Sequence, residues 1–241
     1  VPPPFVTAVA KIVSNSDQST VCETRKRICI PQVVKLVYDA GAVTLIKQGH
    51  SGYTNGAPCV FINPMSDAEW ETQRGRIRSL AQALMDVAGA NVRFIDNSAS
   101  LNAPFTTLTM RVSQNPEFGV TTGDFLNVNP EGVGYLNANA LRDGVGLYWD
   151  NHPEFQLPVL ANEVGFLWGK VAAHECAHAL GLVAPGNVLG GSTGWHNPGT
   201  SGVQVMDKGE NITYEQRLGR GEDWGWRSIN RDYLLFLLPK Q

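Results

Sequence analysis

The chain has 241 residues, of which 43% are hydrophobic and 17% are charged. This composition is typical of a folded globular protein and excludes a disordered chain. A formal charge of -3 and a pI near 6.0 give no reason to expect nucleic acid or an anionic membrane as a partner. The apolar run at 233–238 is far too short to span a membrane.

The first 55 residues read as an N-terminal extension that contains a β-hairpin. The β-rich runs at 32–38 and 42–46 flank the turn residues 39–41, which predicts two paired strands. Because the sequence begins at Val1 without an initiator methionine, we expect a processed form of the protein. Residues 56–241 then form the larger domain, and the sequence shows no second linker.

The larger domain begins with alternating strand and helix signals. Ser66 with Glu69 three residues later is the signature of a helix N-terminus. The residues after Ser66 are apolar at helical period, and the Gly-containing segment 88–91 ends that pattern. The predicted elements are a strand over 58–62, a helix over 70–87, strands over 91–95 and 106–112, and further strands over 133–136 and 144–149.

A second helix is predicted from an apolar face that leads into a group of histidines. Apolar residues at 160, 164, 167 and 171 follow the spacing of a buried helix face. His174 and His178 come next, four residues apart, so both rings lie on one side of the helix and can reach the same ion. Glu175 is rotated by about 100° from His174 and is placed to act as a general base rather than as a ligand. Gly181 is expected to end the helix in a left-handed conformation.

These residues form the pattern His-Glu-x-x-His-x-x-Gly, which resembles the metzincin family of metallopeptidases. In that family a third histidine follows three residues after the glycine, but here that position is Ala184, which cannot bind a metal. The chain has five histidines, and His196 is the one that lies downstream of the motif. This arrangement is similar to the leishmanolysin branch, in which a loop is inserted before the third histidine. The resemblance therefore implies that His174, His178 and His196 bind one catalytic Zn²⁺.

The resemblance also carries expectations for the rest of the fold. Met206, ten residues after His196, matches the methionine turn that lies beneath the metal in this family. The implied fold class is α+β: a mixed twisted sheet with a backing helix and the active-site helix in an upper lobe that ends near residue 181. A smaller irregular lower lobe follows and ends in a C-terminal helix at 228–238. One of the strands at 133–136 and 144–149 is expected to be the sheet edge that an extended peptide joins.

The implied function is that of a zinc-dependent endopeptidase acting on peptide or protein substrates. The metal lowers the pKa of its water and polarises the scissile carbonyl, while Glu175 accepts the proton and returns it to the leaving amine. The tyrosine that some relatives have two residues after the methionine is absent, because Lys208 stands there. Tyr214 is a weak substitute. The sequence does not determine the substrate, the activation route or the oligomeric state.

Three alternatives compete with this interpretation. A gluzincin-type peptidase would take Glu210 or Glu215 as its third ligand, although Gly181 and His196 favour the metzincin arrangement. Residues 190–194 match the nucleophile-elbow pattern of serine hydrolases, but loop residues on both sides argue against it. Finally, the loss of a ligand at Ala184 would suit a non-catalytic binding protein with the same fold.

Two further observations concern calcium and cysteines. Several Asn and Asp residues suggest a Ca²⁺ site, and turn chemistry explains them equally well: Asp124, Asn127, Asn129, Asn137 and Asp143. The four cysteines are Cys22, Cys29, Cys59 and Cys176. A Cys22–Cys29 disulfide would suit a secreted or otherwise extracytoplasmic protein, but the sequence alone does not choose the pairing. Cys176, beside the predicted base, is expected to be a small buried apolar residue.

Overall fold

The computed structural model describes most of the predicted core of the chain. The described residues are 5–13, 20–29, 31–54, 57–62, 64–96, 105–115, 117–123, 127, 129–139, 163–182, 196–197, 204–207, 216 and 224–238. The strands predicted at 144–149 and most of the predicted lower lobe lie outside these residues.

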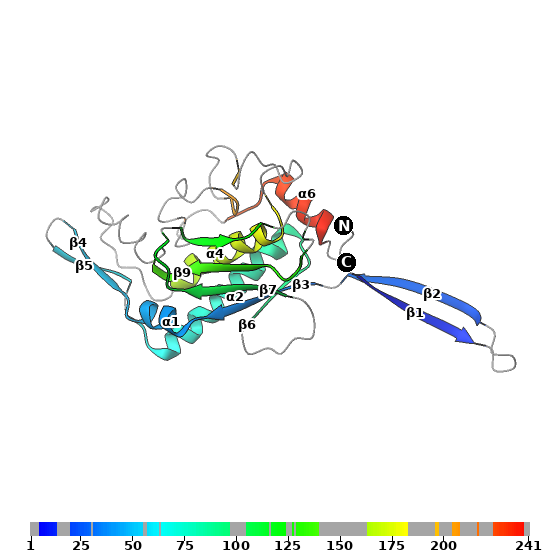
Figure 1. The fold of residues 1–241 in the computed structure, drawn as a ribbon, viewed down its shortest axis with the longest axis horizontal. Helices are drawn as coiled ribbons and strands as arrows, with labels where there is room; N and C mark the ends of the chain where they lie inside the picture. The colour runs from blue at the N-terminus through cyan, green and yellow to red at the C-terminus, as the bar shows by residue number, and fades with distance from the viewer. Residues whose placement is uncertain are drawn as a thin grey trace.

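A five-stranded mixed sheet forms the centre of the molecule (Figure 1). Its strand order is β6-β3-β7-β9-β8, where β3 is Gln32–Tyr38, β6 is Val92–Asp96, β7 is Phe105–Arg111, β8 is Gly119–Thr121 and β9 is Val133–Asn137. The first four are parallel to one another, and β8 is antiparallel to β9. Buried and partly exposed residues alternate along β7, which shows that only one face of this sheet carries the core. The α+β class is confirmed.

The predicted hairpin at 32–46 is wrong. Residues 32–38 form β3, which has a parallel partner on each side. Residues 42–46 lie in helix α1, Ala40–Lys47, because the side chain of Asp39 caps its N-terminus by accepting a hydrogen bond from the Gly41 N–H. Ala42 and Ile46 are four residues apart and both buried, so the apolar run that resembled a strand is a helix face. Residues 32–47 therefore belong to the main sheet domain and not to an extension that ends at residue 55.

Helix α2, Asp67–Ala88, matches the prediction closely. Ser66 accepts a hydrogen bond from the Glu69 N–H while Glu69 accepts one from the Ser66 N–H, which completes the capping box. The helix ends at Gly89, whose φ of 76° is in the left-handed region. The prediction of this helix from its cap and its periodicity is confirmed.

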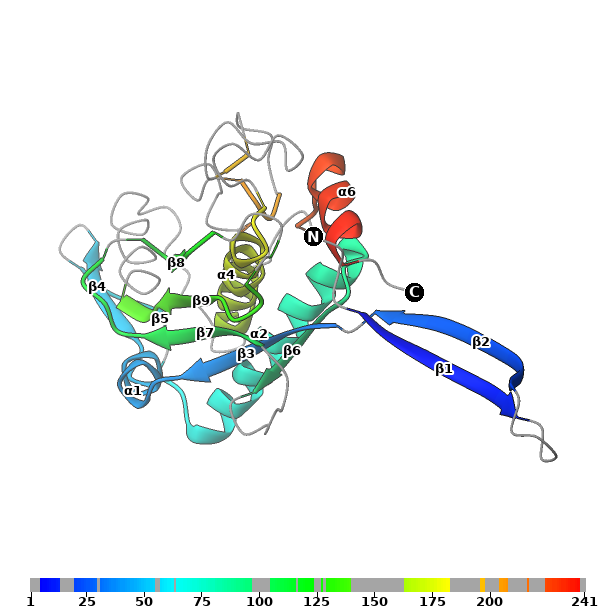
Figure 2. The ribbon, with the colours of Figure 1, turned by 45° about the vertical axis from the view of Figure 1, so that its right-hand side comes forward.

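Helix α4, Val164–Ala179, packs on α2, and both helices cover one face of the sheet (Figure 2). The two helices approach closely at Gly165 and Gly169, where a Cβ would lie 2.7 Å from Arg76 Cβ and 2.9 Å from Leu80 Cβ. Val164, Leu167 and Val171 are buried, as their spacing predicts. This packing fixes the helix that carries the His-Glu-x-x-His motif.

Strand β8 is the edge of the sheet nearest to the end of α4. The predicted strand at 133–136 is confirmed as β9, but it lies between β7 and β8 and is not an edge strand. Residues 119–121 were not predicted as a strand, because three residues are too few to show an alternating pattern. Among the described strands β8 is therefore the edge on this side of the sheet, while the other predicted candidate, at 144–149, lies outside the described residues.

Two hairpins lie outside the main sheet. Strands β1, Phe5–Val13, and β2, Thr20–Cys29, pair with each other and with no other described strand, and they extend away from the sheet (Figures 1 and 2). Cys22 and Cys29 lie on the same extended strand, seven residues or about 23 Å apart, so they cannot form the predicted disulfide with each other. Strands β4, His50–Thr54, and β5, Ala57–Ile62, form the second hairpin, and the strand predicted at 58–62 is confirmed.

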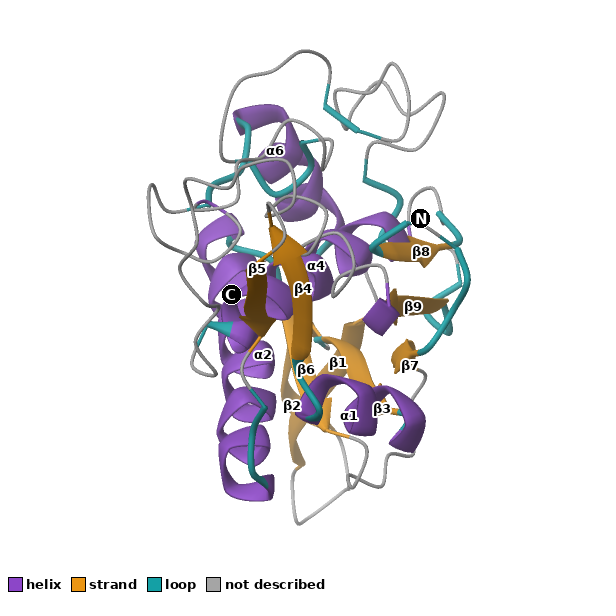
Figure 3. Ribbon diagram, turned by 90° about the vertical axis from the view of Figure 1, so that its left-hand side faces the viewer, coloured by secondary structure: helices purple, strands orange, loops and turns teal. Residues whose placement is uncertain are grey.

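The predicted C-terminal helix is confirmed as α6, Ser228–Leu237, which lies beside the ends of α2 and α4 (Figure 3). The hydroxyl of Tyr233 donates a hydrogen bond of 2.9 Å to the Leu180 carbonyl, just after α4. This bond satisfies a buried carbonyl that the helix end leaves without an intrahelical donor. Among the described helices, none is both long and apolar enough to cross a membrane.

We predict that Gly89→Ala destabilises the protein. A side chain at residue 89 would have to adopt a left-handed backbone conformation, and its Cβ would lie 2.8 Å from Leu235 Cδ2. We expect a loss of about 1–2 kcal/mol in the free energy of unfolding, measured by urea denaturation. Gly75→Ala, within α2 and without a heavy atom within 4 Å of the added Cβ, is the control and should raise stability by up to about 1 kcal/mol. Equal effects at both positions would contradict this account.

Candidate metal centre

The end of α4 presents His174 and His178 from adjacent turns of one helix. Their Nε2 atoms lie 3.1 Å apart and their rings are nearly perpendicular, at 86°. The helix stops in a Schellman motif: the Gly181 N–H donates to the His178 carbonyl and the Leu182 N–H donates to the Ala177 carbonyl. Gly181 has a φ of 81°, so the predicted left-handed stop is confirmed. The chain can therefore turn away immediately after the second histidine.

His196, fifteen residues after the helix stop at Gly181, lies beside this pair. Its ring is 5.2 Å from that of His174 and 5.5 Å from that of His178, measured between centroids. The three histidines offer ligand nitrogens that all lie within 4.8 Å of one another. The three predicted ligands are thus close enough to bind a metal ion.

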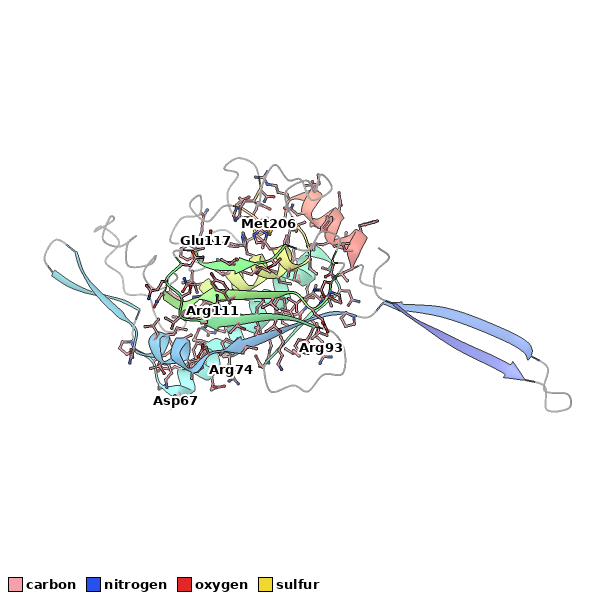
Figure 4. The ribbon with its side chains drawn as sticks, viewed as in Figure 1. Asp67, Arg74, Arg93, Arg111, Glu117 and Met206 are labelled. Carbon is pink, nitrogen blue, oxygen red and sulfur yellow. The ribbon has the colours of Figure 1, made fainter. Side chains whose placement is uncertain are left out.

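Met206 lies in a tight turn of residues 204–207 beside these histidines. The Asp207 N–H donates to the Gln204 carbonyl across the turn, and the Met206 side chain is fully buried. Figure 4 shows Met206 near α4 and α6. Backbone carbonyls of this turn accept hydrogen bonds from His174 and from Asn197, the residue after His196. His174 Nδ1 is 2.5 Å from the Val205 carbonyl, and the Asn197 N–H donates to the Met206 carbonyl.

A buried polar pair connects the third histidine to the turn. The Asn197 side-chain amide donates a hydrogen bond of 2.8 Å to Asp207 Oδ1, and both residues are buried. Arg227, just before α6, lies 3.5 Å from the same oxygen and forms an ion pair with Asp207. A side-chain hydrogen bond therefore joins Asn197, which follows His196, to Asp207, which follows Met206. The sequence analysis missed Asp207, whose position directly after the methionine was its only signal.

The environment of His178 favours a neutral imidazole. Burial lowers the pKa of His178 well below its usual value, and the proximity of His174 and His196 lowers it further, while a hydrogen bond with the Leu182 backbone acts in the opposite direction. Because His174 Nδ1 must donate its proton to the Val205 carbonyl, its Nε2 keeps a lone pair that points toward His178. Metal binding requires neutral rings, so the lowered pKa of His178 suits ligation.

Glu175 lies on the same helix, buried beside strand β8. The Thr121 hydroxyl donates a hydrogen bond of 2.8 Å to Glu175 Oε2. Burial raises the pKa of Glu175 to about 8, the hydrogen bond from Thr121 lowers it, and the nearby charge of Glu117 raises it. Glu117 lies just before β8 (Figure 4). A buried carboxyl group with a pKa near neutrality is suited to accepting and returning a proton.

The other site residues suggested by the sequence either lie away from the three histidines or fall outside the described residues. Three calcium candidates are engaged in ordinary hydrogen bonds: Asn129 and Asn137 accept from backbone N–H groups, and Asn127 donates to Gln32. The remaining candidates fall outside the described residues: Asp124, Asp143, Ala184, Lys208, Glu210, Tyr214, Glu215 and residues 190–194. Cys176 is completely buried, as predicted, and burial raises the pKa of its thiol.

Comparison of the chain with protein-family models, with curated proteins and with solved structures gave no significant match. The geometry of the histidines and of Glu175 is therefore the basis for any statement about function.

The raised pKa of Glu175 predicts how the stability of the metal-free protein depends on pH. Between the unfolded pKa of 4.5 and the folded pKa of about 8, the native state binds a proton that the unfolded state has released. The contribution of Glu175 to the free energy of unfolding therefore decreases with rising pH in this window, by up to about 1.4 kcal/mol per pH unit. Glu175→Gln removes this contribution, whereas the opposite contribution of His178 is present in both proteins.

We expect the difference in unfolding free energy between Glu175→Gln and wild type to grow from pH 5 to pH 8, measured by urea denaturation with chelator present. A difference that stays constant across this range would show that the carboxyl group of Glu175 titrates normally.

Asp207 is predicted to support metal affinity without contacting the ion. Asp207→Ala releases Asn197, and with it the backbone that carries His196, so we expect zinc affinity to fall by about 10- to 100-fold. A chromogenic chelator competing for the metal provides the measurement. Asp96→Ala is a matched control, since Asp96 lies on β6, at the opposite edge of the sheet from β8, where it pairs with Arg78, and should leave affinity unchanged. Equal affinities of Asp207→Ala and Asp96→Ala would contradict the role of the pair.

Proposed function

We propose that the protein is a zinc-dependent endopeptidase of the metzincin type, with His174, His178 and His196 as metal ligands and Glu175 as general base. The observation that carries this proposal is the meeting of three histidine nitrogens within 4.8 Å at the end of a helix that also holds a buried carboxyl group. Zinc is the favoured metal because it readily takes three imidazole nitrogens in a tetrahedral arrangement.

The three histidines fit such an ion in chemistry as well as in position. Imidazole nitrogens bind zinc in their neutral form, and a backbone carbonyl orients His174 by accepting its Nδ1–H. Three protein ligands leave a fourth position for water or substrate, which distinguishes catalytic zinc sites from structural ones. Bound zinc would act as a Lewis acid, lowering the pKa of water and polarising a carbonyl.

The chain's own residues supply the remaining steps. Glu175 accepts a proton from the attacking water and passes it to the nitrogen of the departing amine. His174, whose Nδ1–H remains bonded to the Val205 carbonyl, keeps its ring orientation throughout. The buried turn at 204–207 accepts hydrogen bonds from His174 and Asn197 and so positions the histidines, which is the role expected of a methionine turn. These roles produce hydrolysis of an amide bond without a covalent intermediate on the protein.

The substrate is proposed to be an extended peptide that lies along β8. Among the described strands, β8 pairs only with β9, so its second edge offers backbone hydrogen-bonding groups. An extended segment added there would run past Glu175, because Thr121 of β8 contacts that carboxylate. Backbone pairing makes little demand on sequence, which favours a peptidase of broad substrate range. A secreted or extracytoplasmic location stays a prediction.

The test combines zinc binding with peptide cleavage. Purified protein is incubated with a diverse peptide pool, with and without a zinc chelator, and the products are identified by mass spectrometry. We expect one tightly bound zinc and cleavage that the chelator abolishes. Glu175→Gln should retain zinc while its rate falls by about 100-fold or more, and His196→Ala should lose both zinc and activity.

Two results would contradict the proposal. Zinc binding that survives His196→Ala would exclude this histidine as the third ligand and favour a glutamate in its place. Tight zinc binding through all three histidines with no cleavage of any peptide would instead favour a non-catalytic binding protein.

A further inference from the structure

The carboxylate of Glu175 lies against Gly119 and Thr121 of the edge strand β8, and Thr121 in turn packs on Gly134 of β9; we call these three residues the carboxylate seat. Gly119 and Thr121 are two residues apart on β8, so they face the same side of the sheet. Gly134 on β9 is the register partner of Thr121. The carboxylate seat therefore consists of residues from two neighbouring strands, β8 and β9, and faces the side chain of Glu175 on α4.

Gly119 leaves the space that Glu175 occupies. A Cβ at residue 119 would lie 2.4 Å from Glu175 Oε1, 2.5 Å from its Cδ and 2.6 Å from its Cγ. All three nearest atoms belong to the same side chain, and no backbone atom is among them. Consequently, any side chain at residue 119 displaces the carboxylate rather than the strand or the helix.

Gly134 likewise leaves the space that the Thr121 side chain occupies. A Cβ at residue 134 would lie 2.2 Å from Thr121 Oγ1 and 2.9 Å from Leu108 Cδ2. With glycine there, the Thr121 hydroxyl can lie over β9 and donate its 2.8 Å hydrogen bond to Glu175 Oε2. Gly119 thus leaves room for the Glu175 carboxylate, Thr121 donates a hydrogen bond to it, and Gly134 leaves room for Thr121.

We propose that the carboxylate seat positions Glu175 for proton transfer, with Thr121 as a positioning residue. The Thr121 hydroxyl holds Oε2, which leaves Oε1 to accept the proton when the O–H bond of water breaks. The same Oε1–H bond then breaks as the proton passes to the leaving amine. This inference rests on the proposed peptidase function and adds to it the residues that aim the base.

A purely structural role is the competing explanation, since a buried carboxyl group needs a hydrogen-bond partner in any case. The two roles differ in what they affect. A positioning residue alters the rate of the chemical step while leaving substrate affinity and metal affinity in place. A structural residue alters folding stability and changes turnover only through the amount of folded protein.

The first experiment tests the geometry in the metal-free protein by a double-mutant cycle. Gly119→Ala should lower the urea midpoint when Glu175 is present. In the Glu175→Ala background, where the three atoms that the new Cβ meets are gone, the same substitution should have little effect. Gly132→Ala, whose Cβ meets its nearest atoms at 3.6 Å, is the control and should be additive with Glu175→Ala. Additive effects of Gly119→Ala would overturn the seat.

The second experiment measures kinetics and zinc affinity of the zinc-loaded enzyme. We expect Thr121→Val to lower kcat by about 10- to 100-fold, with KM and zinc affinity unchanged, and Thr121→Ser to restore kcat close to wild type. Gly119→Ala should lower kcat by about 100-fold while zinc stays bound. Thr109→Val, a partly buried threonine on β7, is the matched control and should not change kcat.

The outcomes distinguish failure of the positioning role from failure of the peptidase function. A Thr121→Val enzyme with wild-type kcat, or a Thr121→Ser enzyme as slow as Thr121→Val, would overturn the positioning role. An inactive wild-type protein would overturn the peptidase function and, with it, the catalytic use of the seat. The double-mutant cycle would even then report whether Gly119 and Glu175 compete for the same space, because it needs neither metal nor substrate.

Discussion

The docking of the turn at 204–207 onto helix α4 is the interaction on which the candidate metal centre depends. One helix can supply two histidines, but a third ligand has to come from another part of the chain. The Val205 carbonyl accepts from His174, and the Met206 carbonyl accepts from the residue after His196. Two consecutive carbonyls of one buried turn therefore set the relative positions of the helix and the returning segment.

The buried surroundings of this centre have opposite effects on its two kinds of titratable group. Burial keeps His178 neutral, which prepares it as a ligand, but it also keeps Glu175 protonated near neutral pH. A cation between the three imidazoles would favour the ionised carboxylate through charge attraction. The same ion would thus complete the ligand set and convert Glu175 into a base, so that binding and activation are linked.

The elements that the sequence predicted well are those whose signals are local. The capping pair Ser66 and Glu69 marks the start of α2, and the apolar spacing before His174 marks α4. His196 could be selected because no other histidine lies downstream of the motif. By contrast, the run from Ala42 to Ile46 has strand-like composition, and only the cap at Asp39 and burial against the core make it helical. Local composition was outweighed there by tertiary packing.

The contacts that could not be predicted join residues far apart in the chain. Thr121 and Glu175 are separated by 54 residues, and β8 is too short to be recognised by periodicity. A glycine such as Gly119 has many uses, and nothing in its neighbours indicates that a carboxylate lies above it. The sheet order makes the contact possible: the edge strand β8 brings this glycine beside α4, on whose face Glu175 lies. The ligands of the candidate centre can thus be found from a motif, whereas the residues that contact Glu175 appear only when the edge strand and the helix are placed together.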